Sequence, residues 1–178
     1  MADIVIAGFG GQGVLTAGKI LIDVAAALDN EVSWTSSYGA EMRGGTANCS
    51  IVVSKEEIGT PYPTKLDILM VMNEPSYDKF IDSVRPGGYV IVNSSLVTKE
   101  QYPDDLKVFK VDATSIANEL GSGRAANLVM LGAAMKATNL VDPDLFAKGM
   151  NGFFDNKGKN SPKNMECYKA GMEKVCAC

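Results

Sequence analysis

The sequence predicts an α/β fold: a doubly wound, mostly parallel sheet with a Rossmann-like first βαβ unit and a helical C-terminal third. Two observations carry this prediction. Short apolar runs alternate with longer segments of helical periodicity up to about residue 112, and only helical patterns follow. The chain has 178 residues, 46% apolar and 21% charged, which is enough to bury a sizeable core. No repeat or low-complexity linker divides it, so a single domain, residues 1–178, is expected.

Residues 3–36 are predicted to form the first βαβ unit. Residues 4–7 are a continuous apolar run, typical of a buried parallel strand. The helix expected at 14–28 carries one narrow polar stripe, and residues 32–35 complete a βαβ unit. Further strands are expected at 48–54, 67–72, 89–92 and 106–111. Further helices are expected at 74–84, 113–120, 125–137, 142–151 and 162–175.

The helix at 125–137 is apolar on nearly all sides, with Asn127 and Lys136 as its only plainly polar residues. Its small residues around Gly132 allow close approach of another backbone. Such a helix is buried either in the chain's own core or in a subunit interface. Both interpretations stay open at this point.

Composition excludes several functions. There are 17 basic against 21 acidic residues, giving a net charge of −4, so nucleic acid is not expected as a partner, although residues 148–178 are locally basic. There is no histidine, which removes Ser–His and Cys–His catalysis and the commonest zinc ligand. We therefore assign no catalytic residue to this chain.

The four cysteines do not form a recognisable site. They lack C-x-x-C and the iron–sulfur spacings, so no metal site is expected. Cys176 and Cys178 are expected to lie in a solvated tail. No apolar run reaches the length of a membrane span and no basic segment precedes the first strand, which favours a cytoplasmic protein without a membrane partner.

A glycine-rich loop follows the first strand. Gly8, Gly10 and Gly13 take the glycine positions of G-x-G-x-x-G, and Gly11 and Gln12 complete the loop. Its backbone N–H groups and the helix start behind it can hold a phosphate. A dinucleotide site requires an acid after the second strand, where the sequence reads Thr35-Ser36-Ser37. A purely structural glycine turn remains the alternative.

A second loop follows the second strand and is expected at the same edge of the sheet. A solvated surface loop is the alternative, but its mixture of Tyr, Met and glycines favours an interface or a site. The candidate residues are Tyr38, Gly39, Glu41, Arg43, Gly44 and Gly45.

Two long stretches, residues 8–18 and 37–50, strongly resemble the gamma subunit of 2-oxoacid:ferredoxin oxidoreductases. Shorter segments resemble the same family: Ile58-Gly59-Thr60-Pro61, Pro86-Gly87-Gly88 with Asn93-Ser94-Ser95, and Asn127 to Gly132. Pyruvate-type chains tend to read Arg-Gly-Gly-Gln-Gly and Phe-Gly-x-Glu-Arg-Arg-Gly-Ala. This chain reads Phe9-Gly-Gly-Gln-Gly13 and Tyr38-Gly-Ala-Glu-Met-Arg-Gly-Gly45, which looks more like the 2-oxoglutarate or branched-chain type.

The resemblance implies a complex that oxidatively decarboxylates a 2-oxoacid, with 2-oxoglutarate favoured, forms acyl-CoA and reduces ferredoxin. It places thiamine diphosphate, magnesium and the iron–sulfur clusters on alpha, beta and delta-type partner subunits. It implies no cofactor held firmly by this chain and no activity of the chain alone. A free-standing Rossmann-type nucleotide-binding oxidoreductase and a regulatory module with a borrowed fold are the alternatives.

Overall fold

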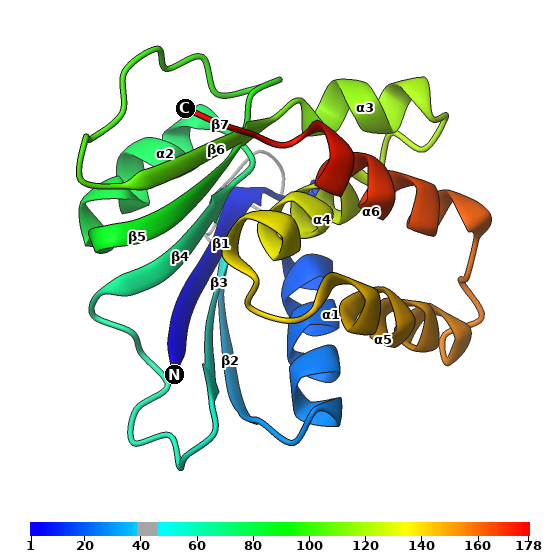
Figure 1. Ribbon diagram of the computed structural model, residues 1–178, viewed down its shortest axis with the longest axis horizontal. Helices are drawn as coiled ribbons and strands as arrows, with labels where there is room; N and C mark the ends of the chain where they lie inside the picture. The colour runs from blue at the N-terminus through cyan, green and yellow to red at the C-terminus, as the bar shows by residue number, and fades with distance from the viewer. Residues whose placement is uncertain (39–45) are drawn as a thin grey trace.

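The computed structural model describes residues 1–38 and 46–178. Within them one sheet contains seven strands, in the order β2-β3-β1-β4-β5-β6-β7 (Figure 1). The strands are β1 (Ala2–Phe9), β2 (Glu31–Tyr38), β3 (Thr46–Ser54), β4 (Leu66–Val71), β5 (Val84–Asn93), β6 (Lys107–Val111) and β7 (Cys176–Ala177). The helices are α1 (Val14–Ala27), α2 (Glu74–Phe80), α3 (Ala113–Glu119), α4 (Ala126–Thr138), α5 (Pro143–Asp155) and α6 (Pro162–Lys174), with a 3₁₀ turn at Ile81–Ser83.

The predicted mostly parallel α/β sheet is confirmed. Strand β1 pairs in parallel with β4, β4 with β5, and β5 with β6. The first unit differs from the expected βαβ, because β3 lies between β1 and β2 and pairs antiparallel with both. Burial explains this order: most of β3 is buried, whereas β2 is only partly covered and lies at the sheet edge.

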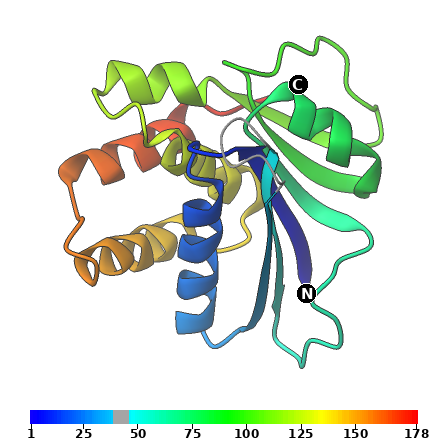
Figure 2. The ribbon, with the colours of Figure 1, turned by 180° about the vertical axis from the view of Figure 1, so that it is seen from behind.

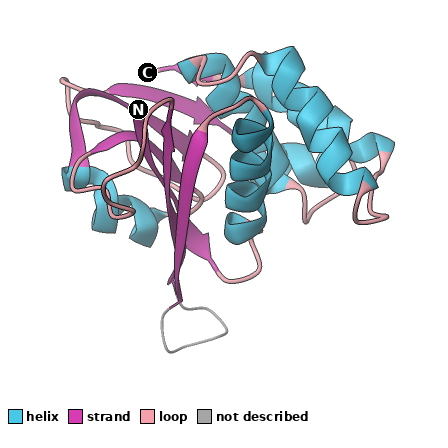
Figure 3. Cartoon of the chain, turned by 90° about the horizontal axis from the view of Figure 1, so that it is seen from below, coloured by secondary structure: helices cyan, strands magenta, loops and turns pink. Residues whose placement is uncertain are grey.

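The two faces of the sheet are covered unequally (Figures 1 and 2). Helices α1, α4, α5 and α6 gather on one side, where they form the larger apolar core with the strands. Helix α2 covers part of the other face, over a smaller core. Figure 3 shows the same division from below, with most of the helical mass on one side of the sheet.

Helix α4 lies at the centre of the larger core. Every residue from Ala126 to Met135 is buried by the rest of this chain, so the helix needs no second subunit to cover it. It crosses α6 at two glycines, as its small residues predicted. A Cβ on Gly132 would overlap the Tyr168 carbonyl oxygen, and one on Gly171 would overlap the Val129 carbonyl oxygen.

The C-terminal segment is exposed, as expected, but its backbone is paired with the sheet. Strand β7 pairs antiparallel with β6, with Cys176 opposite Lys110 and Ala177 opposite Phe109. The Cys178 N–H also donates to the Val108 carbonyl, at 3.0 Å. This pairing was not predicted, because the edge of β6 offers backbone partners to any nearby segment and the sequence carries no local sign of it. No helix among the described residues has the length and apolarity to cross a membrane.

Strand β5 begins at Val84, five residues before the start that we expected. The early part carries Arg85, whose guanidinium contacts Asp3 at 3.3 Å and Asp67 at 3.0 Å. Burial raises the pKa of the Asp3 carboxyl, and the negative charge of Asp67 raises it further, while Arg85 opposes both. Arg85 therefore permits two neighbouring carboxylates at the amino ends of parallel strands.

We expect Arg85→Met to lower the free energy of unfolding by about 1–2 kcal/mol at pH 7.5, between the values for exposed and buried pairs. Without Arg85 the pKa of Asp3 in the folded protein rises further above its unfolded value. The folded state then retains a proton that the unfolded state releases, so the loss of stability grows as pH rises above about 4. Urea denaturation of the wild type and of Arg85→Met at pH 4.5 and 7.5 measures this loss of stability.

The control for this prediction is Lys99→Met, which removes an exposed contact of 2.9 Å to Asp78. It should lower the free energy of unfolding by less than Arg85→Met does, because the ion pair is exposed. An equal loss of stability for Arg85→Met at both pH values would contradict the role given to Asp3.

Candidate functional site

The glycine loop joins the carboxyl end of β1 to the first turn of α1. Gly11 and Gly13 have φ values of 98° and 76°, in the left-handed region that favours glycine. Gly13 is the N-cap of α1, and no side chain caps the helix there. The first N–H groups of a helix have no partner within it, so this loop presents backbone donors at the positive end of the helix dipole.

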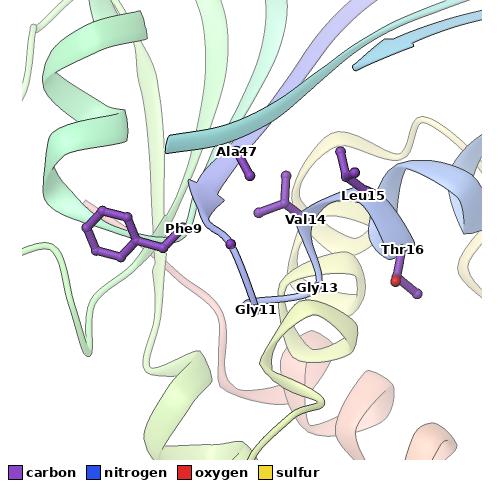
Figure 4. Close-up of a pocket in the computed structure, with 8 residues that line it drawn as sticks. Phe9, Gly11, Gly13, Val14, Leu15, Thr16 and Ala47 are labelled. Carbon is purple, nitrogen blue, oxygen red and sulfur yellow. The ribbon is translucent and has the colours of Figure 1, made fainter. Parts of the chain in front are cut away.

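A hollow of about 620 Å³ lies against these donors (Figure 4). Figure 4 shows the loop as a turn, with Phe9 on one side and Val14 and Leu15 on the other. The wall is therefore largely apolar, and its polar groups are mainly backbone. The lining residues are Phe9, Gly10, Gly11, Gly13, Val14, Leu15, Thr16 and Ala47.

A second hollow, of about 450 Å³, shares Gly11, Gly13 and Thr16 with the first. It extends from the loop to the starts of α4 and α6, and its charged lining residues, Arg124 and Lys159, are both cations. The hollow thus combines two exposed positive side chains with an uncapped helix start, an arrangement that attracts anions.

The side chain of Gln12 does not line either hollow. Its Oε1 accepts from the Phe9 N–H at 2.6 Å and from Asn73 Nδ2 at 3.0 Å, and its Nε2 donates to the Met72 carbonyl at 3.2 Å. Gly8 leaves room for this amide, because a Cβ there would lie 2.6 Å from Gln12 Oε1. Gln12 and Gly8 therefore shape the loop from its inner side.

Two further amides continue this arrangement at the ends of the next strands. Asn73, 2% exposed, follows β4 and caps α2 by accepting from the Ser76 N–H at 3.0 Å. Asn93, fully buried, ends β5 and donates to the same Met72 carbonyl at 3.2 Å. We call Gln12, Asn73 and Asn93 the amide cluster. It joins the carboxyl ends of three neighbouring parallel strands.

Asn127 supports the loop from the other side. This residue, 4% exposed, is a polar position of the otherwise apolar helix α4, and its Nδ2 donates to the Gly13 carbonyl at 3.1 Å. A Cβ on Gly13 would lie 2.6 Å from that nitrogen. The glycine at position 13 is thus required by close packing as well as by its backbone angle.

The structure places the two ends of the second predicted loop beside the glycine loop. In the backbone ladder Tyr38 pairs with Ala47, and Ala47 lies opposite Gly8. Gly39, Glu41, Arg43, Gly44 and Gly45 lie outside the described residues. Within residues 1–38 and 46–178, no group of three or more His, Cys, Asp or Glu side chains could hold a metal ion.

Sequence reasoning named Gln12 as a site residue but missed Arg124, Lys159 and the roles of Asn73 and Asn93. Lys159 belongs to the locally basic segment 148–178, which was the one signal available for it. Arg124 and Lys159 meet the glycine loop only through the packing of α4 and α6, which no local pattern reveals. Asn73 and Asn93 follow apolar runs directly, and that position at the ends of parallel strands could have marked them.

The chain is thus an α/β protein with a glycine loop at the carboxyl edge of its sheet, the edge at which open α/β sheets bind their ligands. Residues 3–174 match the family model described as "Pyruvate ferredoxin/flavodoxin oxidoreductase". The chain therefore belongs to this family, as a gamma-type subunit of 2-oxoacid:ferredoxin oxidoreductase.

Two curated relatives are equally similar in sequence. The 2-oxoglutarate synthase subunit KorC of Methanocaldococcus jannaschii is 38% identical over 175 residues, 96% of this chain and 92% of that protein. The ketoisovalerate oxidoreductase subunit VorA of Methanothermobacter marburgensis is 38% identical over 169 residues, 94% of this chain. The chain spans only 35% of the length of that VorA subunit.

Solved structures share the fold. The gamma subunit of a keto/oxoacid ferredoxin oxidoreductase from Geobacter sulfurreducens superposes with a TM-score of 0.81 at 27% identity, covering 97% of this chain and 95% of that one. The 2-oxoglutarate:ferredoxin oxidoreductase of Magnetococcus marinus, solved with 2-oxoglutarate, coenzyme A and succinyl-CoA bound, gives a TM-score of 0.80 at 22% identity, covering 98% of this chain and 30% of that one.

Proposed function

We propose that this chain is the subunit without thiamine or clusters in a cytoplasmic complex that oxidatively decarboxylates a 2-oxoacid to acyl-CoA and reduces ferredoxin. We assign the glycine loop, Gly8 and Gly10 to Gly13, to coenzyme A. Thiamine diphosphate, magnesium and the iron–sulfur clusters belong to alpha, beta and delta-type partners in this proposal. The second loop, from Tyr38 to Gly45, is assigned to the interface with a partner or to the same site.

The observation that carries the assignment is the uncapped start of α1 at the glycine loop. Coenzyme A is a thiol joined through a pantetheine arm to phosphate groups. Its site therefore requires hydrogen-bond donors for the phosphates next to a slot for the arm. The two hollows provide both: backbone N–H groups with Arg124 and Lys159 for the phosphates, and a wall with Val14 and Leu15 for the arm. This chain's contribution is binding and orientation, since its composition offers no general base of the histidine type.

The fold argues against the free-standing dinucleotide enzyme. In a dinucleotide fold the second strand lies beside the first, and its terminal acid reaches the ribose. Here β3 occupies that place, and because it runs antiparallel to β1 its first residues, Thr46 and Ala47, lie next to the loop. Within residues 1–38 and 46–178, no Asp or Glu lines either hollow.

We favour 2-oxoglutarate as the substrate, followed by branched-chain 2-oxoacids. The match with KorC covers 92% of that protein, so KorC is a separate subunit of about the size of this chain. The match with VorA covers only 35% of that much longer subunit. The loop sequences that separate this chain from the pyruvate type point the same way.

Affinity purification from the native cells, with a tag on this chain, tests the proposal. We expect larger thiamine- and cluster-bearing subunits to copurify, and the eluate to reduce a viologen dye with 2-oxoglutarate and coenzyme A. The chain expressed alone should show no such activity. If the copurified complex prefers 2-oxoisovalerate to 2-oxoglutarate, the substrate assignment is wrong. A monomer of this chain that binds NAD tightly would contradict the proposal as a whole.

A further inference from the structure

We propose that the amide cluster sets the conformation in which the glycine loop binds coenzyme A, and that Asn73, which lies outside the hollows, is a positioning residue for this ligand. The inference rests on the proposed function of the glycine loop. It adds to the machinery of the site a residue that follows another strand, 61 positions along the chain from Gln12.

The first step concerns Gln12. Its amide makes three hydrogen bonds within the protein: two to its oxygen, from Phe9 N–H and Asn73 Nδ2, and one from its nitrogen to the Met72 carbonyl. The bond from Phe9 fixes the last residue of β1, from which the glycine loop departs. Gln12 thus acts on the ligand only through the shape of the loop.

The second step concerns the orientation of that amide. A glutamine amide can be turned by 180°, which exchanges its oxygen and nitrogen. Only one orientation gives the oxygen two donors and the nitrogen an acceptor in this site. The Phe9 N–H and the Met72 carbonyl require this orientation. Asn73 supports it, because its Oδ1 accepts from the Ser76 N–H and its Nδ2 donates to Gln12 Oε1.

The third step concerns the attachment of the cluster to the sheet. The Met72 carbonyl accepts from both Gln12 and Asn93, and the Met72 N–H donates to the Ala7 carbonyl at 2.9 Å. Asn93 also accepts from the Ala113 N–H at 3.1 Å, at the start of α3. The loop is therefore tied to the ends of three strands, and a ligand meets donors that are already in place, which reduces the ordering cost of binding.

The test uses Asn73→Ser in the assembled complex. Serine is a good helix N-cap, so it retains the cap of α2, and it adds no charge, but its side chain has no amide to donate to Gln12. We expect the KM for coenzyme A to rise about tenfold, while kcat changes less than twofold and the KM for the 2-oxoacid is unchanged. The matched control is Asn30→Ala, which removes an amide that donates to the Ala25 and Leu28 carbonyls at the opposite end of α1. Asn30→Ala should lower the melting temperature about as much as Asn73→Ser does, and it should leave both KM values unchanged.

Hydrogen exchange of the full chain gives a readout independent of catalysis. In the wild-type protein the Phe9 amide should be protected, and Asn73→Ser and Gln12→Met should each accelerate its exchange at least tenfold without changing that of Val5 in the same strand.

A Phe9 exchange rate and a KM for coenzyme A that both stay within twofold in Asn73→Ser would overturn the inference. If Gly11→Val raises that KM and Asn73→Ser does not, the positioning role is wrong and the proposed function stands. If neither raises it while Phe9 exchange accelerates, the cluster orders the loop but the loop does not bind coenzyme A, and it is the proposed function that fails.

Discussion

Replacing Gly132 by valine is expected to prevent the chain from reaching its native packing. A Cβ at this position would overlap the Tyr168 carbonyl oxygen and lie 2.9 Å from the Tyr168 carbonyl carbon. Both are backbone atoms of α6, so no side chain can rotate away, and the two helices would have to separate. Overpacking of a close-packed core typically costs about 1–3 kcal/mol, and this backbone clash should reach or exceed the upper end.

Thermal unfolding and the soluble yield of the expressed chain measure this effect. The matched control is Gly152→Ala on α5, where a Cβ meets nothing within 4 Å. That change should stabilise the chain by about 0.5–1 kcal/mol, because glycine is costly within a helix. A Gly132→Val protein that melts within a few degrees of the wild type would show that α4 and α6 do not cross at these glycines.

Replacing Gly11 by valine is expected to impair the use of coenzyme A far more than it lowers stability. A Cβ on Gly11 meets no protein atom within 4 Å, so the substitution costs only the strain of φ +98°, about 1–2 kcal/mol. The new side chain would instead enter the hollow lined by Arg124 and Lys159, in which we place the phosphates. The expected result is a KM for coenzyme A at least tenfold higher.

Gly87→Val provides the control for backbone strain. Gly87 has a φ of +77°, and a Cβ there also meets nothing within 4 Å, but it lies at the start of β5, away from the glycine loop. The two variants should lose similar melting temperature. An equal rise in KM for both would mean that strain, and not occupation of the site, is responsible.

The sequence predicted most of what is local. The apolar runs identified six strands, and the G-x-G-x-x-G spacing placed the glycine loop between β1 and α1, where the structure has it. These features depend on residues within one segment, so the residues themselves reveal them. The buried helix α4 was also evident from its composition, although the sequence left open whether the chain or a partner covers it.

What the sequence could not predict depends on pairing between distant segments. The place of β3 between β1 and β2, the pairing of β7 with β6 and the presence of Arg124 and Lys159 at one hollow all follow from tertiary packing. The role of Gln12 shows the same limit: its position in the loop made it a candidate ligand group, whereas Asn73 and Met72 turn its amide inward.

The central claim is that the glycine loop holds the phosphates of coenzyme A, and a comparison of two thiol substrates tests it most directly. Pantetheine carries the thiol and the arm of coenzyme A without the phosphate groups that we place at the loop. The values of kcat/KM for coenzyme A and for pantetheine should be measured with the wild-type complex and with the Gly11→Val complex. We predict that the substitution lowers kcat/KM for coenzyme A at least tenfold and leaves that for pantetheine within twofold. An equal loss for both substrates, or no loss for either, would contradict the assignment.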